Sequence, residues 1–121
     1  MHPAAVADAG GLLVLAGLLD GVIHDVDEIL VLDATALLVA EYLALRHDAA
    51  PGRARTEFGL ATRPVREWFP VRALAIDVAL DAGTSGDVDA LASLALAHSL
   101  QLPLVTKNRD LTSPQVAILL C

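Results

Sequence analysis

The chain has 121 residues, of which 55% are apolar, and its formal net charge at pH 7 is −7. That length fits one domain with one core, and the apolar fraction excludes a disordered or low-complexity protein. The uncharged stretch 90–106 contains His98, Gln101 and Pro103, and no stretch offers the roughly 20 apolar residues of a membrane-spanning helix. No lysine or arginine precedes Arg46, so no secretory signal is expected. The single cysteine, Cys121, excludes an intrachain disulfide and favours a reducing, cytoplasmic setting.

Short apolar runs alternate along the chain with helix-like patterns. Strands are predicted at 4–7, 29–32, 102–106 and 116–120. Helices are predicted at 12–19, 35–46, 74–80 and 88–100. Connectors or turns are predicted at 10–11, 22–28, 48–56 and 82–86. The run 29–32 also suits the approach to a helix, and the runs 58–60 and 68–71 receive no assignment. Because strands and helices alternate, the sequence favours an α/β fold with a central, mostly parallel sheet.

Acidic residues follow the predicted strands, where the chemistry of a parallel sheet collects. Asp8 follows the first strand, and the segment 106–110 follows the third. Carboxylates that meet in one pocket repel each other and raise each other's pKa, and a divalent cation removes that repulsion. Mg²⁺ and Mn²⁺ prefer oxygen ligands and activate water for attack on a phosphodiester. The sequence has no glycine-rich phosphate-binding loop and no nucleophile elbow that would suggest another chemistry.

Four motifs resemble those of PIN-domain nucleases, and together they span nearly the whole chain. They are Val6-Ala7-Asp8-Ala9-Gly10, Leu38-Val39-Ala40-Glu41-Tyr42-Leu43, the helix start at 87–97, and Leu102-Pro103-Leu104-Val105-Thr106-Lys107-Asn108-Arg109-Asp110-Leu111. The resemblance implies a single PIN-like domain over 1–121, with an α/β/α sandwich fold, that cleaves RNA in a metal-dependent reaction. A chain this short is most similar to the VapC toxin branch, which implies an endoribonuclease, an antitoxin protein as partner and a homodimer.

The resemblance also assigns the site. It makes Asp8, Glu41 and Asp89 the carboxylates that hold Mg²⁺ or Mn²⁺. The fourth acid of the motif falls at Asn108, which completes the expected catalytic set but carries no charge, so metal affinity is expected to be lower. Auxiliary candidates are Thr106, Asp110 and Asp87. Because Asn108 is neutral, a second interpretation stays open, in which the chain is a catalytically weakened PIN-like module for binding or regulation.

Each candidate also has a purely structural interpretation. Asp8 and Asp89 are good helix N-caps, and Asp87 is an alternative cap that would leave Asp89 for the site. Glu41 suits a solvated helix face, and Asn108 suits a turn.

Basic residues gather in one part of an otherwise acidic chain. Six of the eight lysines and arginines lie in 46–72, against three acids. The residues expected to bind RNA phosphates are Arg53, Arg55, Arg63 and Arg66. Phe58 or Trp68 would stack on a base. The alternative is a solvated surface, with the aromatic side chains in the core or at a dimer contact.

A phospho-receiver domain is a third interpretation. The run 29–33 resembles a phospho-acceptor strand, and Thr106-Lys107 resembles the last receiver strand. However, Asp8 is followed by Ala9, so the acid pair of the first receiver strand is missing. A nuclease therefore fits the sequence better.

Overall fold

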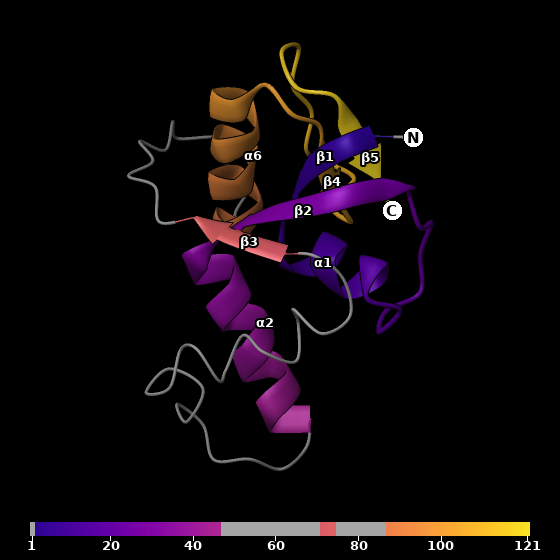
Figure 1. Cartoon of the computed structure of the whole chain (residues 1–121), viewed down its shortest axis with the longest axis vertical. Helices are drawn as coiled ribbons and strands as arrows, with labels where there is room; N and C mark the ends of the chain where they lie inside the picture. The colour runs from indigo at the N-terminus through magenta and orange to yellow at the C-terminus, as the bar shows by residue number, and fades with distance from the viewer. Residues whose placement is uncertain (1, 47–70, 75–86) are drawn as a thin grey trace.

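The structure is a computed structural model that describes residues 2–46, 71–74 and 87–121. Within them, five parallel strands form one sheet in the order β3-β2-β1-β4-β5 (Figure 1). The strands are β1 (His2–Ala7), β2 (Val26–Leu32), β3 (Val71–Leu74), β4 (Leu104–Thr106) and β5 (Ile118–Leu120). The helices are α1 (Ala9–Leu15), α2 (Asp33–Arg46) and α6 (Val88–Leu100). The predicted α/β fold with a parallel central sheet is confirmed.

Helices cover both faces of the sheet, because successive side chains of a strand point to opposite faces and both sets are apolar here. Ala5 of β1 belongs to one core cluster, together with Leu12 of α1 and Val39 of α2. Its neighbour Val6 belongs to the other, together with Leu96 of α6. The result is a sandwich of three layers, with α1 and α2 on one side of the sheet and α6 on the other (Figure 1). None of the described helices is long and apolar enough to cross a membrane.

The strand order places a crevice between two particular strands. From β1 the chain moves outward through β2 to β3, and it then returns by α6 to β4, which pairs with the other side of β1. Where the strand order of an open parallel sheet reverses in this way, the chain leaves the carboxyl ends of the two neighbouring strands toward different helices. This divergence leaves room for a ligand between them. Asp8 directly follows β1, and Thr106 is the last residue of β4. Two of the candidate residues therefore meet at the reversal point.

The double glycine at 10–11 lies inside a helix, so the predicted break there is wrong. Asp8 caps α1 by accepting a hydrogen bond from the Gly11 backbone N–H at 2.8 Å, which starts the helix at Ala9. A Cβ atom at Gly11 would overlap the carbonyl oxygen of Val105 and lie 2.8 Å from its carbonyl carbon. Glycine therefore lets α1 pack directly against the backbone of β4, which is a tertiary reason that the local pattern does not contain.

Two strands also differ from the prediction. β2 begins at Val26, inside the predicted connector, because the chain there pairs with β1 from His2 onward. The sequence predicts no element at 68–71 and a helix that begins at Leu74. In the structure, Leu74 instead ends β3, which pairs with β2 in parallel register. The rest of the predicted helix 74–80, the loop 48–56 and the turn 82–86 lie outside the described residues.

Gly11→Ala is expected to destabilise the protein by about 2 kcal/mol, the usual scale of overpacking against atoms that cannot move aside. The matched control is Gly10→Ala, whose Cβ would lie 3.5 Å from the nearest atom, in ordinary contact with the Lys107 side chain. Alanine is favoured over glycine inside a helix, so the control should be neutral or stabilising. Urea unfolding of both variants measures the difference, and equal stabilities would show that α1 does not pack so closely on β4.

Candidate functional site

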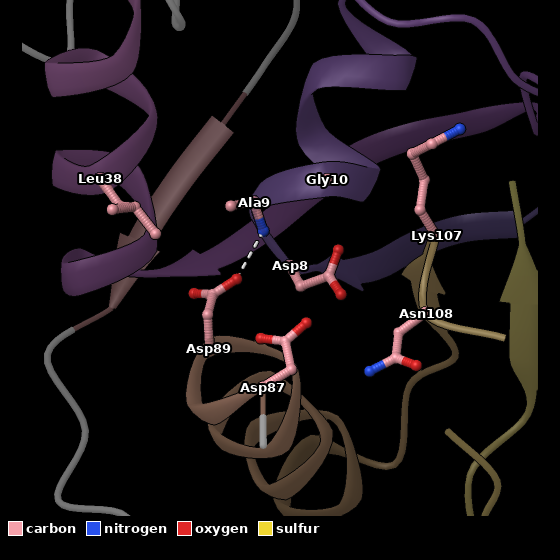
Figure 2. A pocket seen from close by; sticks show the side chains of 8 residues that line it. All are labelled: Asp8, Ala9, Gly10, Leu38, Asp87, Asp89, Lys107 and Asn108. Atoms are coloured by element: carbon pink, nitrogen blue, oxygen red, sulfur yellow. Dashed lines mark hydrogen bonds between the residues drawn. The ribbon is translucent and has the colours of Figure 1, made fainter. Parts of the chain in front are cut away.

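A pocket of about 350 Å³ opens at the carboxyl ends of β1 and β4. Its walls come from the start of α1, the first half of α2, the start of α6 and the end of β4 (Figure 2). The lining residues are Asp8, Ala9, Gly10, Leu38, Asp87, Asp89, Lys107 and Asn108. Three carboxylates and one amide from the predicted site thus share one cavity at the reversal point of the sheet.

Asp8 is the most buried acid of the pocket, with only 3% of its surface exposed. One carboxylate oxygen accepts the Gly11 backbone N–H, and the other accepts the Thr106 hydroxyl at 2.5 Å. Burial raises the pKa of Asp8, and the charges of Asp89 and Asp87 raise it further, while the two hydrogen bonds act in the opposite direction. The structure therefore holds a desolvated carboxylate near two others, which is the situation that a cation would relieve.

Asp89 joins three elements through its carboxylate. One oxygen accepts the backbone N–H of Ala9 at 2.7 Å, and the other accepts the Thr35 hydroxyl at 2.6 Å. Thr35 is fully buried in the first turn of α2. These bonds hold the starts of α1, α2 and α6 around the pocket. Figure 2 shows the bond from Ala9 to Asp89.

Asp87, not Asp89, caps α6. Its side chain accepts the backbone N–H of Ala90 at 3.0 Å, so the alternative in which Asp87 is the cap and Asp89 faces the site is confirmed. Asp87 is exposed at the mouth of the pocket, where its charge acts on Asp8.

The turn after β4 is built by side-chain hydrogen bonds. Thr106 is fully buried, donates to Asp8, and accepts the backbone N–H of Asn108 at 3.0 Å. The Asn108 side-chain oxygen accepts the backbone N–H of Asp110, also at 3.0 Å, which orders the turn. Thr106 is therefore a positioning residue for Asp8, and Asn108 both shapes the turn and lines the pocket. Asp110, predicted as an auxiliary site residue, is exposed and is not among the residues that line the pocket.

Glu41 is not brought to the pocket. Leu38, one turn earlier on α2, lines the pocket wall, and Glu41 lies half-buried farther along the helix. Within the described residues, no group of three or more histidine, cysteine or acidic side chains is placed to hold a metal ion. Among the described residues, Glu41 is therefore not seen to converge with Asp8 and Asp89, and Leu38 is the α2 residue that lines the pocket.

The carboxylates present still suit a hard divalent cation. Mg²⁺ sites usually use one or two carboxylates and keep several waters, and the donor set of Asp8, Asp89, Asp87 and Asn108 consists entirely of oxygens. Each carboxylate oxygen has about two acceptor positions, and the hydrogen bonds to Asp8 and Asp89 use one per oxygen. The residues therefore fit a metal held mainly by Asp8 and Asp89.

Lys107 is a pocket residue that the nuclease interpretation of the sequence missed. It is the one basic side chain among the described residues that line the cavity. Its ammonium turns away from the carboxylates and donates to the Asp20 backbone oxygen at 2.6 Å (Figure 2). Its position directly after Thr106, at the end of a predicted strand, is the sequence signal that could have identified Lys107 as a pocket residue. The predicted phosphate contacts at 53, 55, 63 and 66, and the aromatic residues at 58 and 68, lie outside the described residues.

The raised pKa of Asp8 predicts a pH dependence of stability. As pH rises above the ordinary carboxyl value of 3.8, the unfolded chain releases the Asp8 proton before the folded protein does. The contribution of Asp8 to the free energy of unfolding therefore falls with rising pH until the folded-state pKa is passed. Asp8→Asn lacks this titration, so its stability relative to wild type should increase across that window and then level off. Denaturant unfolding in EDTA at acidic to neutral pH tests this, and a difference that stays constant with pH would contradict it.

No protein-family model and no curated protein sequence matches this chain.

Proposed function

We propose that the protein is a metal-dependent endoribonuclease of the PIN-like, VapC type, which uses Mg²⁺ or Mn²⁺ to hydrolyse RNA phosphodiester bonds. The observation that carries the proposal is the buried Asp8 carboxylate beside Asp89 and Asp87, in a pocket at the reversal point of a parallel sheet. Carboxylates gathered in this way favour a divalent cation bound among them. The resemblance of the motifs around Asp8 and Asp89 to PIN-domain nucleases supports the same chemistry.

The protein's own residues would divide the work. Asp8 and Asp89 would hold the cation, which when bound activates water and neutralises the phosphate. Thr106 would keep the Asp8 carboxylate oriented through its hydroxyl. The Thr35 hydroxyl and the Ala9 N–H would do the same for Asp89.

The test is cleavage of RNA by the purified protein with Mn²⁺, beside the same reaction in EDTA and beside Asp89→Asn. We expect Mn²⁺-dependent cleavage by wild type and its loss in the other two reactions. An amide at position 89 cannot accept both hydrogen bonds, so circular dichroism must show that this variant is folded. Asp87→Asn is a milder variant, because asparagine caps a helix as well as aspartate does, and it should reduce cleavage less. Cleavage that persists in EDTA or in Asp89→Asn would contradict the proposal.

Two observations favour a second candidate, a PIN-like module for binding or regulation with weakened catalysis. Asn108 supplies no charge to the pocket, and Glu41 does not line it. This candidate predicts RNA binding without cleavage at any Mn²⁺ concentration.

The single cysteine leads us to propose a cytoplasmic location. The resemblance leads us to propose an antitoxin that blocks the pocket, and a homodimer. These proposals stay predictions, and size-exclusion chromatography of the purified protein tests the dimer.

A further inference from the structure

The outer side of α2 is unusually apolar for a helix face in contact with water. Leu38, Tyr42 and Leu45 have 48%, 38% and 49% of their surface exposed. They lie three to four residues apart, so they share one side of the helix with the exposed Arg46. We call these four residues the α2 outer face. A contiguous group of exposed apolar side chains is typical of an interaction surface.

This face begins at the pocket. Leu38 lines the cavity together with Asp8 and Asp89, so the outer face continues directly from the site where cleavage is proposed. From Leu38 to Arg46 is eight residues, or about 12 Å along the helix axis. That distance is the length of about three stacked nucleotides at roughly 3.4 Å each.

The far end of the face carries the chemistry that recognises a nucleic acid. The guanidinium carbon of Arg46 lies 5.8 Å from the centre of the Tyr42 ring. An aromatic ring next to an arginine provides a stacking surface for a base and a cation for the adjoining phosphate. Tyr42 is 38% exposed, so part of its side chain can be reached from solvent.

The charge of the chain points to the same ligand. The protein carries a net charge of −7, and the segment 46–72, with six arginines against three acids, is its positive part. A polyanion approaches an acidic protein where the local charge is positive. Arg46 is the first residue of this segment, so the α2 outer face ends where the basic part of the sequence begins.

We propose that the α2 outer face binds single-stranded RNA beside the pocket, with an unpaired base stacked on Tyr42 and the adjoining phosphate paired with Arg46. The proposal rests on the proposed function for the identity of the nucleic acid. A duplex is a poor ligand here, because its bases are already stacked on one another and cannot reach the ring. The site would therefore select unpaired RNA segments.

Binding of a labelled oligouridylate to the full chain in EDTA, followed by fluorescence anisotropy, tests this without any cleavage. Tyr42→Phe keeps the stacking ring and should bind within about two-fold of wild type. Tyr42→Leu keeps an apolar side chain without a ring and should bind about ten-fold more weakly, the scale of one lost base stack. Arg46→Gln should weaken binding and reduce the salt dependence by about one phosphate contact. The same sequence held in a duplex should bind more weakly than the single strand.

Equal binding by Tyr42→Leu and wild type, or equal binding of duplex and single strand, would overturn the proposal. So would a change of oligomeric state in Tyr42→Leu with RNA affinity intact, because the face would then be a protein interface. The outcomes separate the two proposals. RNA that binds through Tyr42 but is never cut contradicts only the nuclease, whereas RNA that is cut equally well by Tyr42→Leu contradicts only this inference.

Discussion

Asp8→Asn is expected to lower Mn²⁺-dependent RNA cleavage by about 100-fold or more, while the metal-free protein stays as stable as wild type. Loss of a residue that merely orients a metal ligand costs about 10- to 100-fold, so loss of the most buried ligand should cost at least as much. The amide keeps one oxygen to accept the Gly11 N–H, so α1 remains capped. The substitution should therefore reduce RNA cleavage without reducing the stability of the fold.

The stability half of this expectation follows from electrostatics. Burial and the neighbouring charges raise the pKa of Asp8, so ionising this carboxyl costs more free energy in the folded protein than in the unfolded chain. An amide resembles the protonated carboxyl group and removes that cost, although its N–H₂ group must now donate to the Thr106 hydroxyl, which reverses that hydrogen bond. The net change should be within about 1 kcal/mol of zero or stabilising.

The matched control for Asp8→Asn is Asp27→Asn, which removes the same charge from an exposed position in β2. The control should leave both cleavage and stability unchanged. A large loss of melting temperature in metal-free Asp8→Asn would show instead that Asp8 is mainly a helix cap.

Asn108→Asp is expected to tighten Mn²⁺ binding by about ten-fold. A unit charge about 5 Å from a divalent ion contributes roughly 1.5 kcal/mol even at the dielectric constant of water, which corresponds to a factor of about ten in affinity. The new side chain is nearly isosteric and can still accept the Asp110 N–H, so the turn after β4 should persist. Cleavage at limiting Mn²⁺ should rise accordingly.

The same substitution should weaken the metal-free protein, because a fourth acid joins three like charges in one pocket. Titration calorimetry with Mn²⁺ and unfolding in EDTA measure the two effects. Gln115→Glu is the control, since it makes the same amide-to-acid change at an exposed residue that does not line the pocket. Unchanged Mn²⁺ affinity in Asn108→Asp would place residue 108 outside the metal shell. If only the variant bound metal and cut RNA, the natural protein would be a degenerate nuclease scaffold.

Where local signals decided the structure, the sequence was informative. The helix Val88–Leu100 was predicted with its observed bounds, because Asp87 caps it and its apolar pattern continues to the turn at Gln101. Asp8 and Thr106 were placed at strand ends, and parallel strands bring such ends to one edge.

Other features depend on contacts between distant segments. The helix through Gly11 depends on the backbone of Val105, and β3 exists through its pairing with β2. Leu38 and Glu41 lie on neighbouring positions of one helix, and only the packing of α2 on the sheet decides which of them reaches the pocket. The hydrogen bond between Thr35 and Asp89 spans 54 residues and has no local signature.

The metal centre proposed at Asp8 and Asp89 is tested most directly by anomalous X-ray diffraction from crystals of the wild-type protein grown with saturating Mn²⁺. We expect an anomalous peak in the pocket, at about 2.1 Å from carboxylate oxygens of Asp8 and Asp89, the usual distance for a hard divalent ion of this size. The peak should be absent in crystals of Asp8→Asn. Wild-type crystals without manganese in the pocket, or with manganese bound only elsewhere, would contradict the assignment of this acidic pocket as a metal centre.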